Sequence, residues 1–362
     1  MQFRGRKRFA AVGGAVVAAL ALAACSSSPA TTTPAGGGST PTTTTTASGT
    51  LNGSGSTFQL TFQQAAISGF KSVDPGIKVN YSGVGSGTGR SNLAAGTVNF
   101  AGSDSPIPST EQASFNGKTV LYFPILMGPI AMAYNLPGIS TLKLTPKVIA
   151  EIFQGQIKTW NNGAIAALNT GVHLPSTAIT TAVRSDSSGT TQNFTLFLTE
   201  SAASSWTLGT SSTIKWPSTA RAASGNGGVA SVIKSTAGAI GYVDYTDAKA
   251  SGLSMAEVQN KDGTYVAPST TAASAAGDGV TVAPDLTFHA VWASGASAYP
   301  ITYQTWVLVY EKQPNANDAD MLKAYIGYLL GPAQQLLPTL YYAPLPSSIS
   351  SKAVAQISKI TG

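Results

Sequence analysis

Residues 77–81 (IKVNY) are followed by residues 83–89 (GVGSGTG), and these two stretches set the expected fold class. Apolar and polar residues alternate in the first stretch, as they do in a half-buried β-strand. The second stretch contains only small residues apart from one valine, and it leads into a segment with helical spacing. A strand that passes through a tight loop into a helix is the repeating unit of α/β proteins.

The same order of elements continues along the chain. Further strands are predicted at 120–123 (VLYF) and 306–310 (WVLVY), and helices at 58–70, 146–153 and 321–330. Thr145 precedes Pro146 at the start of one predicted helix, and Gly331 follows the end of another, as helix capping favours. We therefore predict an α/β fold.

Length and composition limit the possible functions. The chain has 362 residues, enough for about two domains of ordinary size. Hydrophobic residues make up 43%, which excludes a disordered chain, whereas charged residues make up only 10%, against about 25% in typical proteins. The net charge is +6, and four of the basic residues lie in the N-terminal segment, at Arg4, Arg6, Lys7 and Arg8. The rest of the chain is nearly neutral, so nothing in it predicts binding to nucleic acid.

Reactive side chains are few. The sequence contains one cysteine, Cys25, and two histidines, His173 and His289. Their number excludes a metal site built from cysteine and histidine, and it leaves little for a mechanism that pairs histidine with cysteine. We therefore predict no metal, no cofactor and no catalytic residue, and we favour a binding protein over an enzyme.

The N-terminal segment has the features of an export signal. Basic residues precede an apolar run over 9–24, and the small residues before Cys25 are similar to the lipobox of bacterial lipoproteins. We predict a signal peptide over 1–24 and an acylated Cys25, with an ordinary cleavage site as the alternative. Residues 25–49 contain no large apolar side chain and are predicted to form a disordered tether to the outer face of the membrane.

Two more loops resemble the one at 83–89. They are residues 53–58 (GSGSTF) and 185–190 (SDSSGT), and each of them lies between a predicted strand and a helical pattern. This arrangement directs unpaired helix N–H groups and hydroxyls at one point, which suits a tetrahedral oxyanion. The alternative for any single loop is an ordinary turn with a Ser or Thr helix cap. No loop matches G-x-G-x-x-G, so nucleotide binding is disfavoured.

Three charged residues accompany these loops. Arg184 stands two residues before Asp186, and an arginine held by a carboxylate can clamp an oxyanion with a fixed fork of donors. An exposed ion pair is the alternative for this pair. Asp104 lies between two serines and before Pro106, where it is either a functional acceptor or part of an ordinary turn.

Six segments together resemble the phosphate-binding protein of the bacterial phosphate ABC importer. They occur in that family's order and nearly its spacing, at 51–58, 81–87, 98–104, 152–160 (IFQGQIKTW), 184–190 and 238–243 (GAIGYV). The resemblance covers the chain after the tether. It implies a two-domain Venus-flytrap fold, as in periplasmic binding proteins, with two hinge crossings and phosphate bound between the domains. We expect one domain over 50–126 and 300–362 and the other over 127–299.

The resemblance also implies a set of phosphate ligands. The expected hydrogen-bond donors are Thr57, Phe58, Ser86, Gly87, Ser188, Gly189 and Thr190. Arg184 would be the cationic donor held by Asp186, and Asp104 would accept a proton of the phosphate. The implied partner is the membrane-embedded permease of the importer, to which a lipid-anchored receptor would deliver inorganic phosphate. One departure from the family is Gln59, which replaces a frequent proline.

Two alternatives remain at this stage. The first is a receptor for sulfate, molybdate or another oxyanion, which Asp104 disfavours because a fully deprotonated anion cannot donate to a buried carboxylate. The second is a secreted phosphatase that uses a loop serine. No G-x-S-x-G motif supports it, since Val84 and Asp186 stand two residues before Ser86 and Ser188.

Overall fold

A mixed β-sheet forms the centre of the computed structural model, which describes residues 46–362. The order of the main strands is β2-β1-β3-β12-β4-β8-β6-β7, and β9 pairs with β4 at the side. The strands of this sheet are β1 (Gly49–Gly55), β2 (Ile77–Gly83), β3 (Phe100–Ser103), β4 (Val120–Asn135), β6 (Thr180–Arg184), β7 (Arg221–Ala223), β8 (Ala239–Asp244), β9 (Ser254–Met255) and β12 (Thr302–Tyr310). A small second sheet contains β5 (Lys143–Leu144), β10 (Glu257–Gln259) and β11 (Tyr265–Val266).

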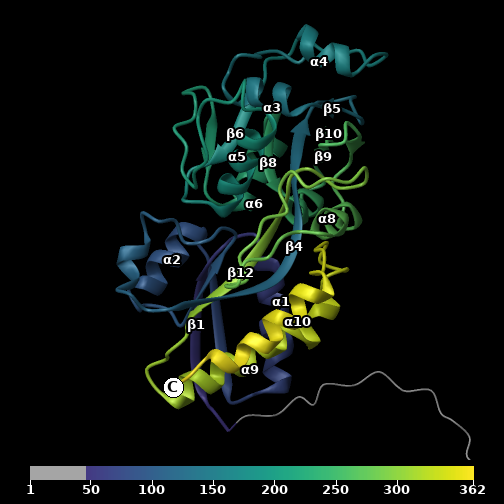
Figure 1. Cartoon of the computed structure of the whole chain (residues 1–362). Helices are drawn as coiled ribbons and strands as arrows, with labels where there is room; N and C mark the ends of the chain where they lie inside the picture. Colours follow the sequence, from purple (N-terminus) through teal and green to yellow (C-terminus); the bar gives the residue numbers. More distant parts are fainter. Residues whose placement is uncertain (1–45) are drawn as a thin grey trace, which may run out of the picture. The chain divides into compact units, whose positions relative to one another are not determined.

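The sheet contains two parallel groups of strands. In one group β1 pairs in parallel with β2 and β3, and in the other β6 pairs in parallel with β7 and β8. We call the half with β1, β2 and β3 the first lobe, and the half with β6, β7 and β8 the second lobe. The antiparallel strands β4 and β12 run between the two groups (Figure 1). The predicted two-domain α/β fold is confirmed.

Helices cover both groups of strands. They are α1 (Leu60–Val73), α2 (Ser86–Ala94), α3 (Pro146–Phe153), α4 (Gly163–Leu168), α5 (Gly189–Ser201), α6 (Gly225–Ser235), α7 (Tyr245–Ala250), α8 (Thr270–Gly277), α9 (Ala316–Leu330) and α10 (Ser347–Gln356). Short 3₁₀ helices occur at Gln112–Phe115, Pro332–Leu336 and Ile357–Lys359. The predicted start of α3 is confirmed, because the Thr145 hydroxyl accepts from the Val148 N–H and Pro146 occupies the first turn.

Several elements start or end away from their predicted bounds, among them β12, which begins at Thr302 rather than 306. Strand β4 continues to Asn135 rather than ending near 123, although it contains Pro124 and Pro129. Each proline lies where the ladder changes: the register with β12 shifts beside Pro124, and β4 exchanges β12 for β8 directly after Pro129. Helix α1 begins at Leu60 rather than 58, because the Ser56 hydroxyl holds the preceding turn.

Apolar side chains fill the space between helices and sheet. Helix α9 buries Leu322, Tyr325, Ile326 and Leu329, the apolar face expected from its spacing. Burial of each such side chain contributes roughly 1.5–3 kcal/mol relative to exposure. Helix α9 starts at Ala316, five residues before the predicted 321, because Asn315 caps it by accepting from the Asp318 N–H.

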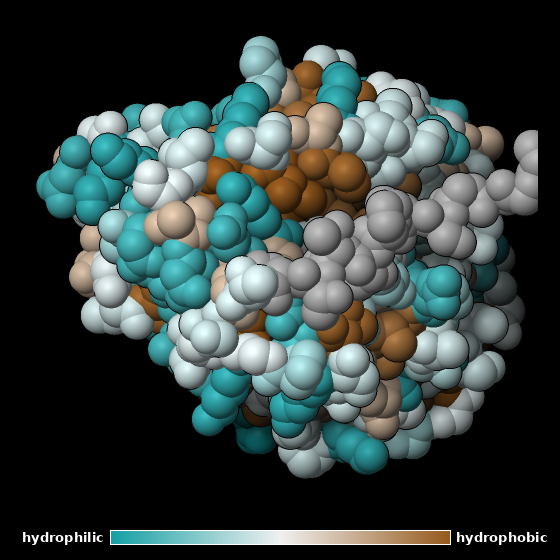
Figure 2. Space-filling model, turned by 90° about the horizontal axis from the view of Figure 1, so that it is seen from below, coloured by the Kyte–Doolittle hydropathy of each residue, from teal (hydrophilic) through white to brown (hydrophobic). Residues whose placement is uncertain are grey.

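The surface of the described residues is mainly polar. Three large hydrophobic side chains are exposed within residues 46–362, those of Val84, Tyr341 and Val354. Figure 2 shows one face of the molecule, on which apolar residues form separate patches among hydrophilic ones. Within the described part of the chain, no helix is long and apolar enough to cross a membrane.

The N-terminal predictions fall mostly outside the described residues. The signal peptide over 1–24, Cys25 and most of the tether belong to the part that is not described. Strand β1 begins at Gly49, one residue before the predicted domain boundary at 50, and the Ser48 N–H donates to the Asn317 side chain. The domain boundaries at 126/127 and 299/300 stay a prediction.

Candidate functional site

The carboxyl ends of the parallel strands in both lobes lead into polar loops. In the first lobe β1, β2 and β3 end before Ser56, Val84 and Asp104, and in the second lobe β6 ends at Arg184. Parallel strands present their carboxyl ends on the same edge of a sheet, where α/β proteins bind ligands. The topology therefore explains why loops far apart in sequence meet.

Direct contacts join these loops across the two lobes. The Gly87 N–H of the first lobe donates to the Ser187 carbonyl of the second, at 3.1 Å. The Asn193 side chain, in α5, donates to the Asp104 carbonyl at 2.7 Å. The three small-residue loops and Asp104 thus form one polar cluster, as the sequence predicts.

Helix N-termini point into this cluster. Helix α2 begins at Ser86 and α5 begins at Gly189, so the first N–H groups of both helices have no partner within their own helix. Together with the positive ends of the helix dipoles, such groups favour an anion. Some predicted donors are already engaged, however: the N–H of Phe58 donates to the Ser56 hydroxyl and that of Ser188 to the Ser212 carbonyl.

Two glycines make the close approach of the loops possible. A Cβ at Gly189 would lie 2.5 Å from Ser86 Oγ and 2.6 Å from Asp104 Cβ, far inside van der Waals contact. Gly85 has φ +90°, and a Cβ there would lie 2.7 Å from the Ser187 carbonyl oxygen. Any side chain at these positions would separate the loops, so glycine is required for the cluster to form.

Asp104 is the buried acceptor of the cluster. Its side chain is 1% exposed, and its carboxylate accepts from the Thr305 hydroxyl at 2.6 Å and the Ser86 hydroxyl at 3.2 Å. Burial raises the pKa of Asp104, although hydrogen bonds from Ser56, Thr305 and Ser86 and the charge of Arg184 act in the opposite direction. An ionised carboxylate can accept a hydrogen bond from a proton-bearing oxygen, whereas it repels a fully deprotonated one.

Arg184 and Asp186 form a fork-to-fork ion pair. Arg184 Nε donates to Asp186 Oδ1 at 2.7 Å and Nη2 donates to Oδ2, while Nη1 lies 3.4 Å from Thr190 Oγ1. Burial alone would lower the pKa of Arg184, but Asp186 raises it, so the guanidinium stays charged. The Gly225 N–H also donates to Asp186. Arg184 is buried and Asp186 is only partly exposed, so the structure disagrees with the alternative of an exposed ion pair.

The predicted donors occupy different positions around this core. Ser188 caps α5 by accepting from the Thr191 N–H, and Thr190 is fully buried beside Arg184. Phe58 is buried and stacks on Tyr303, with ring centroids 4.1 Å apart, whereas Thr57 is partly exposed. The structure brings all the predicted residues to one place, and their role as phosphate ligands stays a prediction.

Asn226 belongs to the cluster but was not predicted from the sequence. Its Nδ2 donates to Thr57 Oγ1 at 3.1 Å and to Thr190 Oγ1 at 3.2 Å, which links the two lobes. The sequence around it, residues 224–228 (SGNGG), follows β7 and forms the N-cap and first turn of α6. This is the same strand, small-residue loop and helix order that marked the other three loops, so a signal was present.

Two polar atoms of the cluster are buried and have no hydrogen-bond partner among residues 46–362. They are Asn226 Oδ1 and the Tyr303 hydroxyl, on side chains that are both fully buried. An unpartnered buried polar group costs about 1–3 kcal/mol. Such a cost is commonly retained where a bound ligand or water supplies the missing partner.

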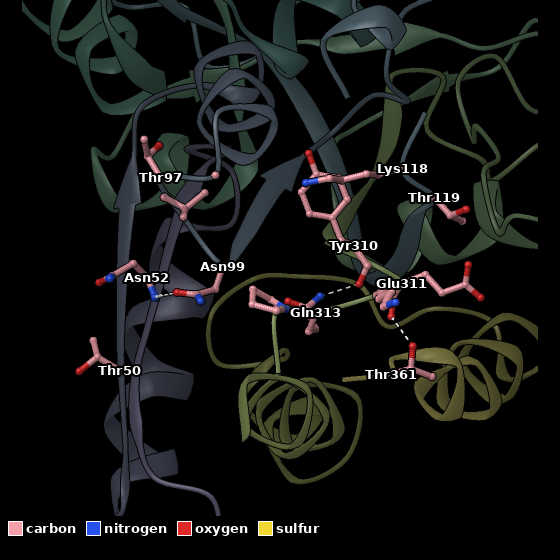
Figure 3. A pocket seen from close by; sticks show the side chains of 14 residues that line it. Thr50, Asn52, Thr97, Asn99, Lys118, Thr119, Tyr310, Glu311, Gln313 and Thr361 are labelled. Atoms are coloured by element: carbon pink, nitrogen blue, oxygen red, sulfur yellow. Dashed lines mark hydrogen bonds between the residues drawn. The ribbon is translucent and has the colours of Figure 1, made fainter. Parts of the chain in front are cut away.

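One pocket of the described residues lies away from the polar cluster. It has a volume of about 1080 Å³ and is lined by residues such as Asn52, Asn99, Tyr310 and Gln313, none of them in the polar cluster (Figure 3). In this pocket the Asn99 side chain accepts from the Asn52 N–H at 2.8 Å, and the Gln313 side chain donates to the Tyr310 carbonyl at 2.6 Å. Among the described residues, no group of three or more His, Cys, Asp or Glu side chains could hold a metal ion.

A fold of two α/β lobes that meet over a buried polar cluster defines a binding protein of the periplasmic-binding-protein class. The profile of the PBP superfamily domain matches residues 40–333. The fold is similar to that of the phosphate-binding protein PfluDING bound with phosphate, with a TM-score of 0.71, 22% identity, and coverage of 84% of this chain and 93% of that one.

Sequence relatives define the family more closely. The chain is 34% identical to phosphate-binding protein PstS 3 of Mycobacterium leprae, over 84% of this chain and 85% of the relative. It is 33% identical to phosphate-binding protein PstS of Pasteurella multocida, over 83% of this chain and 92% of the relative. The chain belongs to the PstS family of phosphate-binding proteins.

Proposed function

We propose that this protein is an extracytoplasmic receptor that binds inorganic phosphate between its lobes. The observation that carries the proposal is Asp104, a buried carboxylate that faces the N-terminal ends of α2 and α5 across from Arg184. The donors bind the anionic oxygens, and Asp104 accepts from a phosphate O–H. Sulfate has no such proton near neutral pH, so the same carboxylate excludes it.

Calorimetric titration of the purified protein with phosphate, sulfate and molybdate tests this proposal. We expect binding of phosphate and little heat from sulfate at neutral pH. Preference for sulfate or molybdate would favour the second candidate, a receptor for another oxyanion. Turnover of a chromogenic phosphate ester that disappears in Ser188→Ala would instead support the phosphatase.

The proposed receptor delivers phosphate to an ABC permease and is held at the membrane by a lipid on Cys25. Family membership supports the transport role, and the small residues before Cys25 support the anchor. Cys25→Ser is expected to release the protein from membranes without a change in phosphate affinity. Membrane association that persists in this variant contradicts lipidation.

The proposed domains, 50–126 with 300–362 and 127–299, close about the two strands that run between the lobes. The exchange of partners along β4 at Pro129 and Ile130 supports a hinge there. Small-angle scattering with and without saturating phosphate is expected to show a more compact particle with phosphate. Superimposable curves, from protein freed of anion carried through purification, contradict closure.

A further inference from the structure

A chain of hydrogen bonds reaches Asp104 from the interior of the first lobe. The Tyr325 hydroxyl donates to Gln63 Oε1 at 2.5 Å, and Gln63 Nε2 donates to Gln59 Oε1 at 3.0 Å. Gln59 Nε2 donates to Thr305 Oγ1 at 2.6 Å, and Thr305 Oγ1 donates to Asp104 Oδ1 at 2.6 Å. All five side chains are at most 1% exposed, so the chain is shielded from water.

The direction of this chain is fixed by the backbone. Gln59 Nε2 also donates to the Trp306 carbonyl at 2.7 Å, and a carbonyl can only accept. The amide nitrogen of Gln59 therefore faces Thr305 and its oxygen faces Gln63. Because Thr305 Oγ1 accepts from Gln59, its single proton cannot point toward Gln59.

The Thr305 proton has two acceptors within reach. They are Asp104 Oδ1 at 2.6 Å and the more distant Ser103 carbonyl at 3.3 Å. Donation by Gln59 polarises the Thr305 hydroxyl, which strengthens its own donation to the carboxylate.

We propose that Gln59 is a positioning residue for anion selection. By donating to the Thr305 hydroxyl, Gln59 directs the Thr305 proton toward Asp104. Asp104 then remains an acceptor for the O–H of a bound phosphate. This inference rests on the proposed phosphate function. Gln59 itself acts only through Thr305.

The surroundings of Asp104 explain why one hydroxyl matters. Burial raises the pKa of Asp104, while its hydroxyl donors lower it, and the charged or titratable groups that face it are Arg184, Tyr81 and Tyr303. Burial likewise raises the pKa of both tyrosines, so they stay neutral and Arg184 is the charged neighbour. Loss of the Thr305 donor therefore favours protonated Asp104. A protonated carboxyl donates rather than accepts, and it then tolerates sulfate.

Sulfate is a suitable probe, because it stays deprotonated over the pH range in which carboxyl groups titrate. The experiment is titration of the full-length protein, in detergent, with sulfate and with inorganic phosphate over a series of pH values. In the wild type we expect sulfate binding to begin only at acid pH. In Gln59→Leu we expect this onset to move upward by about one pH unit, the scale of one hydrogen bond to a charged group.

Gln356→Leu is the matched control, because Gln356 is another buried glutamine whose amide donates to a carbonyl, that of Tyr122, outside the polar cluster. Its sulfate onset is expected to equal that of the wild type. Thr305→Val removes the donor itself and is expected to shift the onset at least as far as Gln59→Leu. The double variant is expected to shift it no further than Thr305→Val alone.

The inference is overturned if sulfate binding to Gln59→Leu begins at the same pH as in the wild type. It is also overturned if the pH shift of the double variant equals the sum of the two single shifts. If Gln59→Leu does not fold, Gln63→Leu replaces it, with a smaller upward shift expected and no shift overturning the inference. The proposed function fails separately, if the wild type does not bind phosphate. If the protein binds phosphate but the pH at which sulfate binding begins is unchanged in every variant, only the inference about Gln59 fails and the proposed function stands.

Discussion

The two lobes supply opposite charges to the polar cluster, and the two charges have different neighbours. In the first lobe Asp104 is surrounded by neutral hydroxyls, including those of Ser86 and Thr305. In the second lobe Arg184 has its own carboxylate, Asp186, which occupies two of its nitrogen atoms. The first lobe thus presents an uncompensated charge and the second lobe a compensated one.

This difference separates two tasks that a phosphate receptor must perform. In the proposed receptor, the neutral ion pair of Arg184 and Asp186 binds an anion without attracting every anion strongly. The proposed role of the uncompensated Asp104 carboxylate is to reject anions that carry no proton. Asp104, Arg184 and Asp186 together carry a net negative charge, so attraction depends on N–H groups, hydroxyls and helix dipoles.

Asp104→Asn is expected to have the largest effect, because it removes the uncompensated charge. An amide can donate to sulfate, so discrimination against sulfate falls by up to about 10⁴-fold, while phosphate affinity falls less. Competition between the two anions measures this ratio. Asp320→Asn, at an exposed position of α9, is the control. Continued exclusion of sulfate by Asp104→Asn would place the discrimination elsewhere.

Arg184→Lys tests the compensated charge of the second lobe. Lysine keeps the positive charge but cannot reproduce the planar fork that bonds both oxygens of Asp186. Phosphate affinity is expected to fall about 10- to 100-fold, the scale of one charged hydrogen bond. The exposed Arg221→Lys serves as control in the same calorimetric titration. An affinity equal to that of the wild type would show that the fork does not contact the anion.

Asn226→Ala tests the link between the lobes and is expected to weaken phosphate binding about tenfold. Asn226 Nδ2 donates to the hydroxyls of Thr57 and Thr190, so each hydroxyl proton is free to point toward an anion. A double-mutant cycle with Thr57→Val measures the coupling, and thermal unfolding measures stability. Strictly additive losses of affinity would mean that Asn226 does not act through Thr57.

The smallest expected effect is on the stability of the protein without phosphate. Burial alone would raise the pKa of Asp186, but Arg184 lowers it, so Asp186 stabilises the fold above the pKa of an unfolded aspartate and loses this contribution as pH falls. The pKa of Asp104 is raised, so its ionised form destabilises the fold and acid relieves this. At neutral pH, Asp186→Asn is expected to lower Tm and Asp104→Asn to raise it, and both differences shrink on acidification. Changes in Tm of the same sign for both variants, measured in thermal unfolding scans, would contradict this difference between the two lobes.

Local sequence patterns predict much of the fold. Helix α3 has the predicted bounds, because Thr145 and Pro146 fix its start through local contacts. The length of β4 was not predicted, because Pro124 and Pro129 interrupt its strand pattern and only their partners in β12 and β8 show that they are tolerated. The length of a strand that depends on its neighbours in the sheet cannot be inferred from its own sequence alone.

In the candidate site, too, some residues are predicted from local sequence and others are not. The three small-residue loops are evident in the sequence, because glycine and hydroxyl residues before a helix have a local physical meaning. Asn226 lies in a fourth segment of this kind, at the start of α6, and was not predicted. Thr305 and Tyr303 precede the strand predicted at 306–310 and belong to β12 in the structure, and Thr305 is 201 residues from its partner Asp104. No local pattern distinguishes these residues from ordinary strand residues.

The bonds that the lobes make with each other have a kinetic consequence. Gly87 donates to Ser187 and Asn226 donates to Thr57, so the lobes hold together partly through their own contacts. These bonds must break along with those to the anion before it leaves, which lengthens the residence time without adding a ligand contact. A permease that draws the lobes apart would therefore control when phosphate is released as well as where it goes.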